Sequence, residues 1–146
     1  MTQHGRKIAV IGLGYVGLPF AVEKAKVGYQ VLGFERNPER ANQVNRGENY
    51  IPDVSDDELR ALSQAKTLQA TIDFDLLVEM DVIVIAVPTP LTKNLTPDLQ
   101  FVEGVTRELA RRLRPGQLVS LESTTYPGTT EEVMLPLLEA SGLLLR

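Results

Sequence analysis

Residues 7–37 read "KIAVIGLGYVGLPFAVEKAKVGYQVLGFERN". Within them, the β-branched run at residues 8–11 predicts a short buried strand, and the apolar residues of 18–27 recur at helical spacing. Three glycines lie between these two segments in the pattern G-x-G-x-x-G, at positions 12, 14 and 17. Such a pattern is weak alone and takes its meaning from the elements around it. Here a predicted strand precedes it and a predicted helix follows it, which is the order of a β-α-β unit.

A second strand and an acidic residue complete this unit. Gly28 is suited to end the helix, and the apolar residues 31–34 predict a strand that Glu35 follows at once. In a dinucleotide-binding unit, the first glycine permits a tight turn and the second lets a pyrophosphate approach the backbone. The third glycine lets the helix pack close to the strand. Free N–H groups and the dipole at the helix N-terminus then attract the phosphates.

We therefore expect this turn to bind NAD. Gly12, Gly14 and Gly17 are expected to seat the pyrophosphate, and the Glu35 carboxylate to accept hydrogen bonds from the ribose 2′ and 3′ hydroxyls. Because this carboxylate repels a 2′-phosphate, NAD is expected rather than NADP. Two alternatives stay open on these residues alone. Arg36 can hold a 2′-phosphate, and the glycines are also compatible with a tight turn in a flavodoxin-like fold.

The rest of the chain continues the alternation of strands and helices. Further strands are predicted at residues 68–71, 82–87 and 118–121, with the opening of another at 143–145. A helix is predicted that begins at Pro38 and ends before Gly47, and another after the Ser55–Glu58 capping box. Further helices are predicted from Asp98 to Leu113 and from Thr129 to Gly142, the latter with a kink at Pro136. Buried strands that alternate with amphipathic helices predict an α/β fold. We expect a Rossmann-type, doubly wound, mostly parallel sheet with helices on both faces.

Composition excludes several classes of function. The 146 residues suffice for one domain, and a formal net charge of −4 argues against nucleic acid as the main partner. The absence of cysteine excludes disulfides, thiolate zinc sites and a cysteine nucleophile within these residues. The only histidine, His4, lies in a polar N-terminal tail, so neither a Ser-His-Asp triad nor a metal site is expected. Without a signal-peptide pattern or a membrane-length apolar segment, we expect a cytoplasmic protein with no membrane partner.

A proline-rich loop follows the predicted strand at residues 82–87 and reads "VPTPL" from Val87 to Leu91. Ligands of open parallel sheets bind beyond the carboxyl ends of the strands, where this loop is expected to lie. Pro88 and Pro90 hold the backbone extended, so the loop can line the cofactor ribose and present Thr89 to it. The same residues are equally compatible with a stiff connector.

A second polar loop, "LESTTYPGTTEE" at residues 121–132, follows the last predicted strand of the sheet. Its cluster of hydroxyls at Ser123, Thr124 and Thr125 can bond the nicotinamide end of a dinucleotide or polarise a bound water. Simpler roles are also open for several of its residues. The Thr129–Glu132 segment is a capping box, the acid at 122 can be solvated, and the tyrosine at 126 can cover the sheet edge.

Three motifs together carry a family resemblance. "IGLGYVGLP", "VPTPL…PDL" and "LESTTYPGTTEEV", in this order and spacing, resemble the N-terminal NAD-binding domain of the UDP-glucose/GDP-mannose dehydrogenase family. The wording is most similar to the UDP-N-acetylglucosamine and UDP-N-acetylmannosamine dehydrogenases, and the match extends over essentially the whole chain. The resemblance implies oxidation of the C6 alcohol of a UDP-sugar to a carboxylate, with reduction of two NAD.

The resemblance also implies a role for each candidate site residue. The pyrophosphate is expected on the loop formed by Gly12, Leu13, Gly14, Tyr15, Val16 and Gly17. The adenosine ribose is expected at Glu35 and the adenosine end near Arg40. The cofactor is expected to be lined by Val87, Pro88, Thr89 and Pro90, and its nicotinamide half to contact Ser123, Thr124 and Thr125. Thr124 matches a threonine that helps to position the catalytic water. The family usually has Asp where Glu35 stands, so the longer acid is expected to be set slightly further back.

The resemblance further implies what these residues lack. The family's catalytic cysteine, lysine, asparagine and a further glutamate lie in later segments, as do its dimerisation helix and its sugar-nucleotide domain. We therefore expect residues 1–146 to be a fragment that binds NAD with reduced affinity and turns over little or no sugar nucleotide, because the second oxidation needs a cysteine. The UDP-sugar is expected to bind mainly to the absent domain, and the full-length protein to form a homodimer or a larger assembly.

Two other classes of protein also fit the glycine loop. Regulatory NAD-binding modules of ion channels and transporters are single Rossmann domains of similar length, but they have no evident need for the proline-rich and threonine-rich loops. A dehydrogenase acting on hydroxyacids or hydroxyacyl thioesters would need a catalytic histidine beyond the region covered here.

Overall fold

The computed structural model describes residues 6–86 and 100–121 of the chain. The elements follow the order β1 (Lys7–Ile11), α1 (Gly17–Val27), β2 (Gln30–Phe34), α2 (Pro38–Arg46), α3 (Asp56–Gln64), β3 (Leu68–Thr71), η1 (Phe74–Glu79), β4 (Val82–Ile85), α4 (Gln100–Ala110) and β5 (Leu118–Leu121). The strands predicted from the sequence are confirmed, with differences of one or two residues at their ends. The predicted helix at 129–142 and strand at 143–145 lie outside the described residues.

Local signals explain where these helices begin and end. The Asn37 side chain accepts a hydrogen bond from the Glu39 amide at 3.0 Å and caps α2, which has Pro38 as its first residue. Gly47 follows α2 in the left-handed conformation, with φ of 73°. Ser55 caps α3 as predicted, whereas the Glu58 carboxylate of the same capping box forms an ion pair with Lys26 of α1.

Three elements differ from the sequence prediction. The short 3-10 helix η1 was not predicted, because six residues are too few to show a helical period. The strand expected over residues 82–87 ends at Ile85, although the next amide, that of Ala86, still donates to Ile11 O at 2.8 Å. The helix expected to reach Leu113 ends at Ala110, and a tighter turn follows in which the amide of Arg112 donates to Leu109 O at 2.9 Å.

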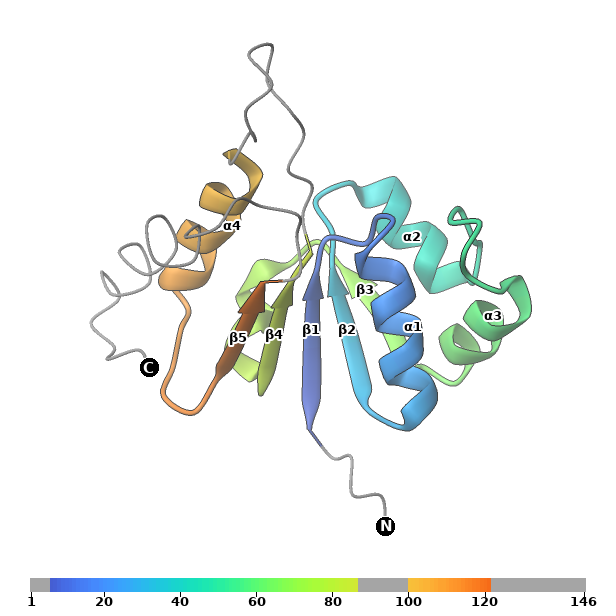
Figure 1. The fold of residues 1–146 in the computed structure, drawn as a ribbon, viewed down its shortest axis with the longest axis horizontal. Coiled ribbons are helices and arrows are strands. Elements are labelled where there is room, and N and C mark those ends of the chain that lie inside the picture. The colour runs from blue at the N-terminus through green and yellow to red at the C-terminus, as the bar shows by residue number, and fades with distance from the viewer. Residues whose placement is uncertain (1–5, 87–99, 122–146) are drawn as a thin grey trace.

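The five strands form one sheet in the order β3-β2-β1-β4-β5, and every pair of neighbours is parallel. The chain runs outward from β1 through β2 to β3, then returns to pair β4 against the other side of β1. Strand order therefore reverses between β1 and β4. Figure 1 shows the carboxyl ends of the strands together at the upper edge of the sheet. The sheet confirms the predicted doubly wound, parallel α/β fold of Rossmann type.

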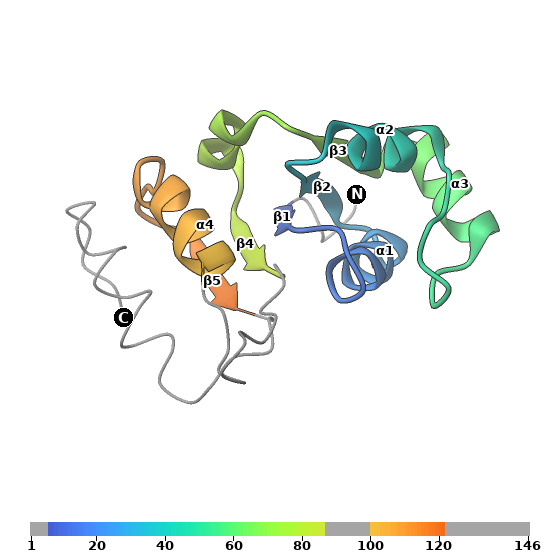
Figure 2. The same ribbon diagram turned by 90° about the horizontal axis from the view of Figure 1, so that it is seen from above.

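Helices cover both faces of this sheet, as predicted. Figure 2, which looks down onto the carboxyl ends of the strands, shows α1, α2 and α3 on one side, with η1 and α4 on the other. Successive side chains of β1 point to opposite faces of the sheet. Ile8 and Val10 pack in the core under α1, whereas Ala9 and Ile11 pack in the core under α4. All four are buried, which explains the continuous apolar run in the sequence.

Edge strand β3 is held by a side chain as well as by its neighbour β2. Asn45 of α2 donates to Ala70 O at 2.9 Å and accepts from the Ala70 amide at 2.8 Å. The side-chain amide thus supplies the two hydrogen bonds that another strand would make. Within the described ranges, no helix has the length and apolar character needed to cross a membrane.

Candidate cofactor-binding site

The predicted glycine loop lies at the carboxyl end of β1, beside the point where strand order reverses. Ligands of open α/β sheets bind in the crevice that forms at such a point. Gly12 follows β1, Glu35 follows β2 and Ala86 follows β4, so three strand ends meet around the loop. The arrangement can be followed in Figure 1, where the loop joins the top of β1 to the top of α1.

Two glycines of the loop are required by the protein's own geometry. Gly12 has φ of 94°, a conformation that favours glycine, and its amide donates to Phe34 O of β2 at 2.8 Å. A Cβ at Gly17 would lie 1.7 Å from Gly12 O and 3.4 Å from the Cβ of Ala86. The first turn of α1 therefore packs directly on the end of β1, as the sequence predicts for the third glycine of the pattern.

Gly14 is different, because nothing in the described protein fills the place of its missing side chain. The atom nearest to a Cβ built there is Arg40 Nη1, at 4.0 Å, and the Gly14 backbone is not in the left-handed region. An alanine would fit the protein, so the protein's own packing does not explain a glycine here. An incoming group that passes close to the backbone does explain it.

The N-terminus of α1 offers hydrogen-bond donors at the same place. Val16 occupies the N-cap position without a side-chain cap, and the first turn carries no acidic residue. The amides of residues 14–17 donate no hydrogen bond to any residue in the described ranges. Uncapped amides at a helix start attract anions, and this site therefore fits the pyrophosphate of a dinucleotide.

Side chains within the loop have divided roles. Leu13 is fully buried and packs over β2, where a Cβ at Gly33 would lie 2.5 Å from Leu13 Cδ1. Tyr15 and Val16 face outward, with 76% and 48% of their surface exposed. Of these three predicted cofactor residues, Leu13 can contribute only through its backbone. The contact between Leu13 and Gly33 was not predicted, because it joins a loop to a strand that is distant in sequence.

The predicted ribose ligand Glu35 lies beside the loop and is already bonded to it. Glu35 Oε1 accepts from the Leu13 amide at 3.2 Å, and Oε2 accepts from the Asn37 amide at 3.0 Å. The side chain is 12% exposed. Each carboxylate oxygen has two lone pairs, so both oxygens retain capacity to accept a ribose hydroxyl. Glu35 is thus anchored to the glycine loop through the Leu13 amide.

The two arginines near Glu35 point to different elements. Arg40 Nη1 lies 4.0 Å from Glu35 Oε1, at the predicted adenosine end of the site. Arg36 instead reaches α4, where its Nη2 lies 3.5 Å from a Cβ built at Gly104. The alternative that Arg36 holds a 2′-phosphate therefore gains no support from its position.

Tyr50 completes this cluster and was not predicted. Its hydroxyl donates to Leu13 O at 2.5 Å, and the Arg40 Cζ lies 4.9 Å from the centre of its ring. Burial raises the pKa of Tyr50 well above its ordinary value; the Glu35 carboxylate acts in the same direction and Arg40 in the opposite one. The residue lies in the connection between α2 and α3, where the sequence shows no periodicity or motif that could have identified it.

Seven predicted site residues lie outside the described ranges, and their predicted roles stay predictions. They are Val87, Pro88, Thr89, Pro90, Ser123, Thr124 and Thr125.

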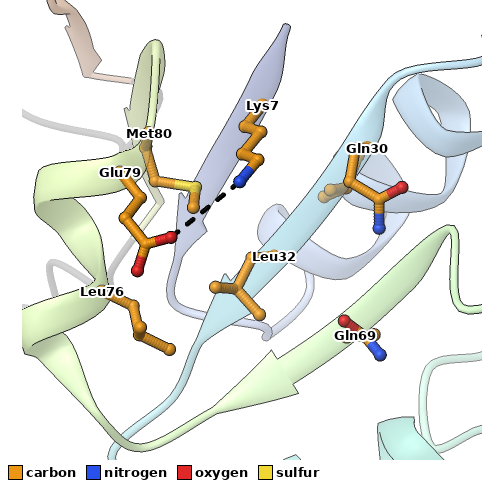
Figure 3. A pocket seen from close by; sticks show the side chains of 8 residues that line it. Lys7, Gln30, Leu32, Gln69, Leu76, Glu79 and Met80 are labelled. Atoms are coloured by element: carbon orange, nitrogen blue, oxygen red, sulfur yellow. Dashed lines mark ion pairs between the residues drawn. The ribbon is translucent and has the colours of Figure 1, made fainter. Parts of the chain in front are cut away.

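A separate hollow of about 390 Å³ lies near the opposite ends of the strands. Figure 3 shows Lys7 and Glu79 reaching toward one another across it, with 3.9 Å between Lys7 Nζ and Glu79 Oε1. Its walls come from the beginnings of β1 and β2, from β3, and from η1. Because dinucleotides bind at the carboxyl ends of parallel strands, this hollow is not part of the candidate site.

Comparison with known proteins agrees with the site geometry. The model of the UDP-glucose/GDP-mannose dehydrogenase family, NAD binding domain, matches residues 6–143. The chain is 39% identical over 132 residues to the UDP-N-acetyl-D-glucosamine 6-dehydrogenase of Salmonella typhi, an alignment covering 90% of this chain and 30% of that protein. It is 40% identical over 128 residues to the UDP-N-acetyl-D-mannosamine dehydrogenase of Escherichia coli K12, covering 86% of this chain and 30% of that protein.

Solved structures show the same likeness. The NDP-N-acetyl-D-galactosaminuronic acid dehydrogenase of Methanosarcina mazei superposes with a TM-score of 0.88 at 34% identity, covering 98% of this chain and 33% of that one. The GDP-mannose dehydrogenase of Pseudomonas aeruginosa superposes with a TM-score of 0.84 at 33% identity, covering 92% and 32%. This chain spans about a third of the length of the curated relatives it matches. It belongs to the UDP-glucose/GDP-mannose dehydrogenase family, and it contains that family's NAD-binding domain.

Proposed function

We propose that this chain is the cofactor-binding part of an NAD-dependent nucleotide-sugar 6-dehydrogenase. The reaction would oxidise the C6 alcohol of a UDP-sugar to a carboxylate, with a UDP-N-acetylhexosamine or UDP-glucose as substrate. The observation that carries the proposal is the meeting of the open Gly14 position, the uncapped start of α1 and Glu35 at two adjacent strand ends. Relatives named as UDP-N-acetylglucosamine and UDP-N-acetylmannosamine dehydrogenases support the substrate class.

Each described group has a definable task toward the cofactor. The amides of residues 14–17 bind the pyrophosphate, and Glu35 accepts the hydroxyls of the adenosine ribose. Arg40, whose Nη1 lies 4.0 Å from Glu35 Oε1, would contact the adenosine end of the cofactor. NAD, when bound, supplies the acceptor for the hydride removed at C6. We propose, from the family resemblance, that Val87–Pro90 and Ser123–Thr125 line the cofactor and that Thr124 helps to position the catalytic water.

The remaining features of the whole protein are also proposals. Residues 1–146 would form the NAD-binding domain, and the sugar nucleotide would bind mainly to a domain that these residues do not include. We infer a homodimer or larger assembly for the full-length protein and a cytoplasmic location. The relatives and solved structures reported above are named as dehydrogenases, which gives no support to a regulatory NAD-binding module.

Calorimetry and steady-state assays test this function in two steps. The 146-residue chain is expected to bind one NAD, and the full-length protein to produce NADH with one or more members of a UDP-sugar panel. Absence of binding heat with a well-folded chain would overturn the cofactor assignment. NADH production by the 146-residue chain alone would contradict the proposal that later segments carry the catalysis.

The Glu35→Gln substitution is expected to change cofactor choice. The amide oxygen can still accept from the Leu13 amide, but the negative charge is lost. Hydrogen bonds to a charged acceptor are roughly twice as strong as neutral ones, so NAD affinity is expected to fall about tenfold. NADP affinity is expected to rise, because its 2′-phosphate no longer meets a carboxylate. Calorimetric titration with each dinucleotide measures the ratio of NAD affinity to NADP affinity.

Glu39→Gln is the matched control. This carboxylate lies in the first turn of α2, 71% exposed and paired with Arg46 rather than with the loop. Its neutralisation removes one charge and its ion pair with Arg46 but no contact with the glycine loop, so the ratio of NAD affinity to NADP affinity should stay near the wild-type value. Equal ratios for Glu35→Gln and the wild type would show that Glu35 does not set the preference.

A further inference from the structure

Tyr50 forms two contacts that join three parts of the candidate site. Its hydroxyl donates to Leu13 O in the glycine loop at 2.5 Å, across 37 positions of sequence. Its ring lies under the Arg40 guanidinium, with 4.9 Å between Arg40 Cζ and the ring centre. Arg40 in turn approaches Glu35 and the open position at Gly14. One side chain thus supports both the loop and the charged group above it.

The backbone around Tyr50 is itself held in place. Asn49 Oδ1 accepts from the Ile51 amide at 2.9 Å, and Asn49 Nδ2 donates to Val54 O at 2.6 Å. Ile51 and Val54 are buried in the core under α1. The backbone that carries Tyr50 is therefore fixed by hydrogen bonds and core packing. A side chain on such a backbone can hold the groups that it contacts, here the Leu13 carbonyl and the Arg40 guanidinium, in position.

Peptide geometry connects the Tyr50 hydroxyl to the predicted phosphate site. The Leu13 carbonyl and the Gly14 N–H belong to one planar trans peptide, so they point in opposite directions. The Tyr50 hydroxyl donates to the Leu13 carbonyl, and the Glu35 carboxylate accepts from the N–H of Leu13 itself, which belongs to the preceding peptide. These two hydrogen bonds fix the orientation of the Gly14 N–H, which donates to no residue in the described ranges. The Gly14 N–H is thereby aimed away from the Tyr50 hydroxyl.

We propose that Tyr50 is a positioning residue for the dinucleotide site. It orients the Leu13–Gly14 peptide so that the Gly14 amide meets the diphosphate, and it holds Arg40 at the adenosine end. The inference rests on the proposed binding of NAD at the glycine loop. Burial raises the pKa of the Tyr50 hydroxyl, so the group remains a hydrogen-bond donor throughout the physiological pH range.

Two substitutions separate the contacts. Tyr50→Phe removes the hydroxyl and leaves the ring under Arg40, and affinity for both NAD and ADP is expected to fall about five- to tenfold. Tyr50→Leu also removes the ring, and a further loss of about threefold is expected from freeing Arg40. In an Arg40→Met background, that further loss should disappear, because the two changes remove the same contact. Calorimetry of the 146-residue chain gives the affinities.

Thermal unfolding and a control distinguish positioning from stability. Tyr29→Phe removes the hydroxyl of another partly buried tyrosine, located between α1 and β2, far from the carboxyl ends of the strands. It is expected to leave NAD affinity unchanged. A merely structural role for Tyr50 would lower the melting temperature while the folded majority binds NAD normally. In NMR spectra of the ¹⁵N-labelled chain, the chemical shift of the Gly14 amide should change in Tyr50→Phe and stay unchanged in Tyr29→Phe.

The possible results distinguish the positioning role of Tyr50 from the proposed binding of NAD on which it rests. If the wild-type chain binds NAD and Tyr50→Phe binds NAD and ADP equally tightly, the positioning role is wrong and the cofactor assignment stands. If the wild-type chain binds no NAD, both are overturned. If Tyr50→Leu does not fold, the decision rests on Tyr50→Phe, which keeps the ring and its packing.

Discussion

Gly14→Ala is expected to abolish tight NAD binding in a chain that remains as stable as the wild type. Among the residues that the structure describes, the added methyl group meets only Arg40 Nη1, at 4.0 Å, and the backbone there is one that alanine adopts. We expect the free energy of unfolding to change by less than about 0.5 kcal/mol. The methyl group occupies the approach of the pyrophosphate to the loop amides, so the Kd for NAD is expected to rise about 100-fold, or about 2.7 kcal/mol.

Gly17→Ala is the informative partner of that variant. Its Cβ would lie 1.7 Å from Gly12 O, a backbone atom that cannot rotate away. Overpacking of this kind costs about 3 kcal/mol or more, which lowers the melting temperature by about 10 °C and displaces the loop. Thermal unfolding and calorimetry on the two variants measure the contrast. Wild-type NAD affinity in Gly14→Ala would mean that the diphosphate does not cross this position.

Leu13 and Gly33 are expected to behave as one packing unit. Leu13→Ala empties a fully buried site and should destabilise the chain by about 2–5 kcal/mol. Gly33→Ala places a methyl group 2.5 Å from Leu13 Cδ1 and should cost about 1–3 kcal/mol, with weaker NAD binding because Leu13 carries the loop. In the double variant the new methyl group enters the space that Leu13 vacates. The loss of stability in the double variant should therefore be at least about 1 kcal/mol smaller than the sum of the losses in the two single variants.

Gly104→Ala provides the matched control for this cycle. Among the described residues, the nearest atom to its added Cβ is Arg36 Nη2, at an ordinary contact distance of 3.5 Å, and the position lies within α4. Alanine is favoured over glycine inside a helix, so this variant should be neutral or up to about 1 kcal/mol more stable. Strict additivity in chemical denaturation of the Leu13 and Gly33 variants would show that the two residues do not share their packing.

The sequence was sufficient to predict the features that depend on neighbouring residues. The strand at 8–11, the turn at Gly12 and the acid after β2 each follow from a short run of residue types, and all were found where expected. The parallel order of the sheet also followed, because buried strands alternating with helices leave few other arrangements.

Contacts between distant segments could not be predicted in this way. Tyr50 reaches Leu13 across 37 positions, and nothing in its own segment indicates that it will. In the sequence, Gly33 is only a glycine within a strand, and the structure shows that Leu13 packs against it where a side chain would lie. The direction of Arg36 toward α4 likewise depends on how that helix lies on the sheet. These details follow from three-dimensional packing, which local propensity does not determine.

The side-chain contacts of Glu35, Arg40 and Tyr50 with one another and with Leu13 join residues between positions 13 and 50. The proposed contacts to the adenosine side of the cofactor are therefore encoded in one continuous segment of fewer than forty codons. An engineer who transplants the segment together with its supporting strands would carry dinucleotide recognition along as a unit.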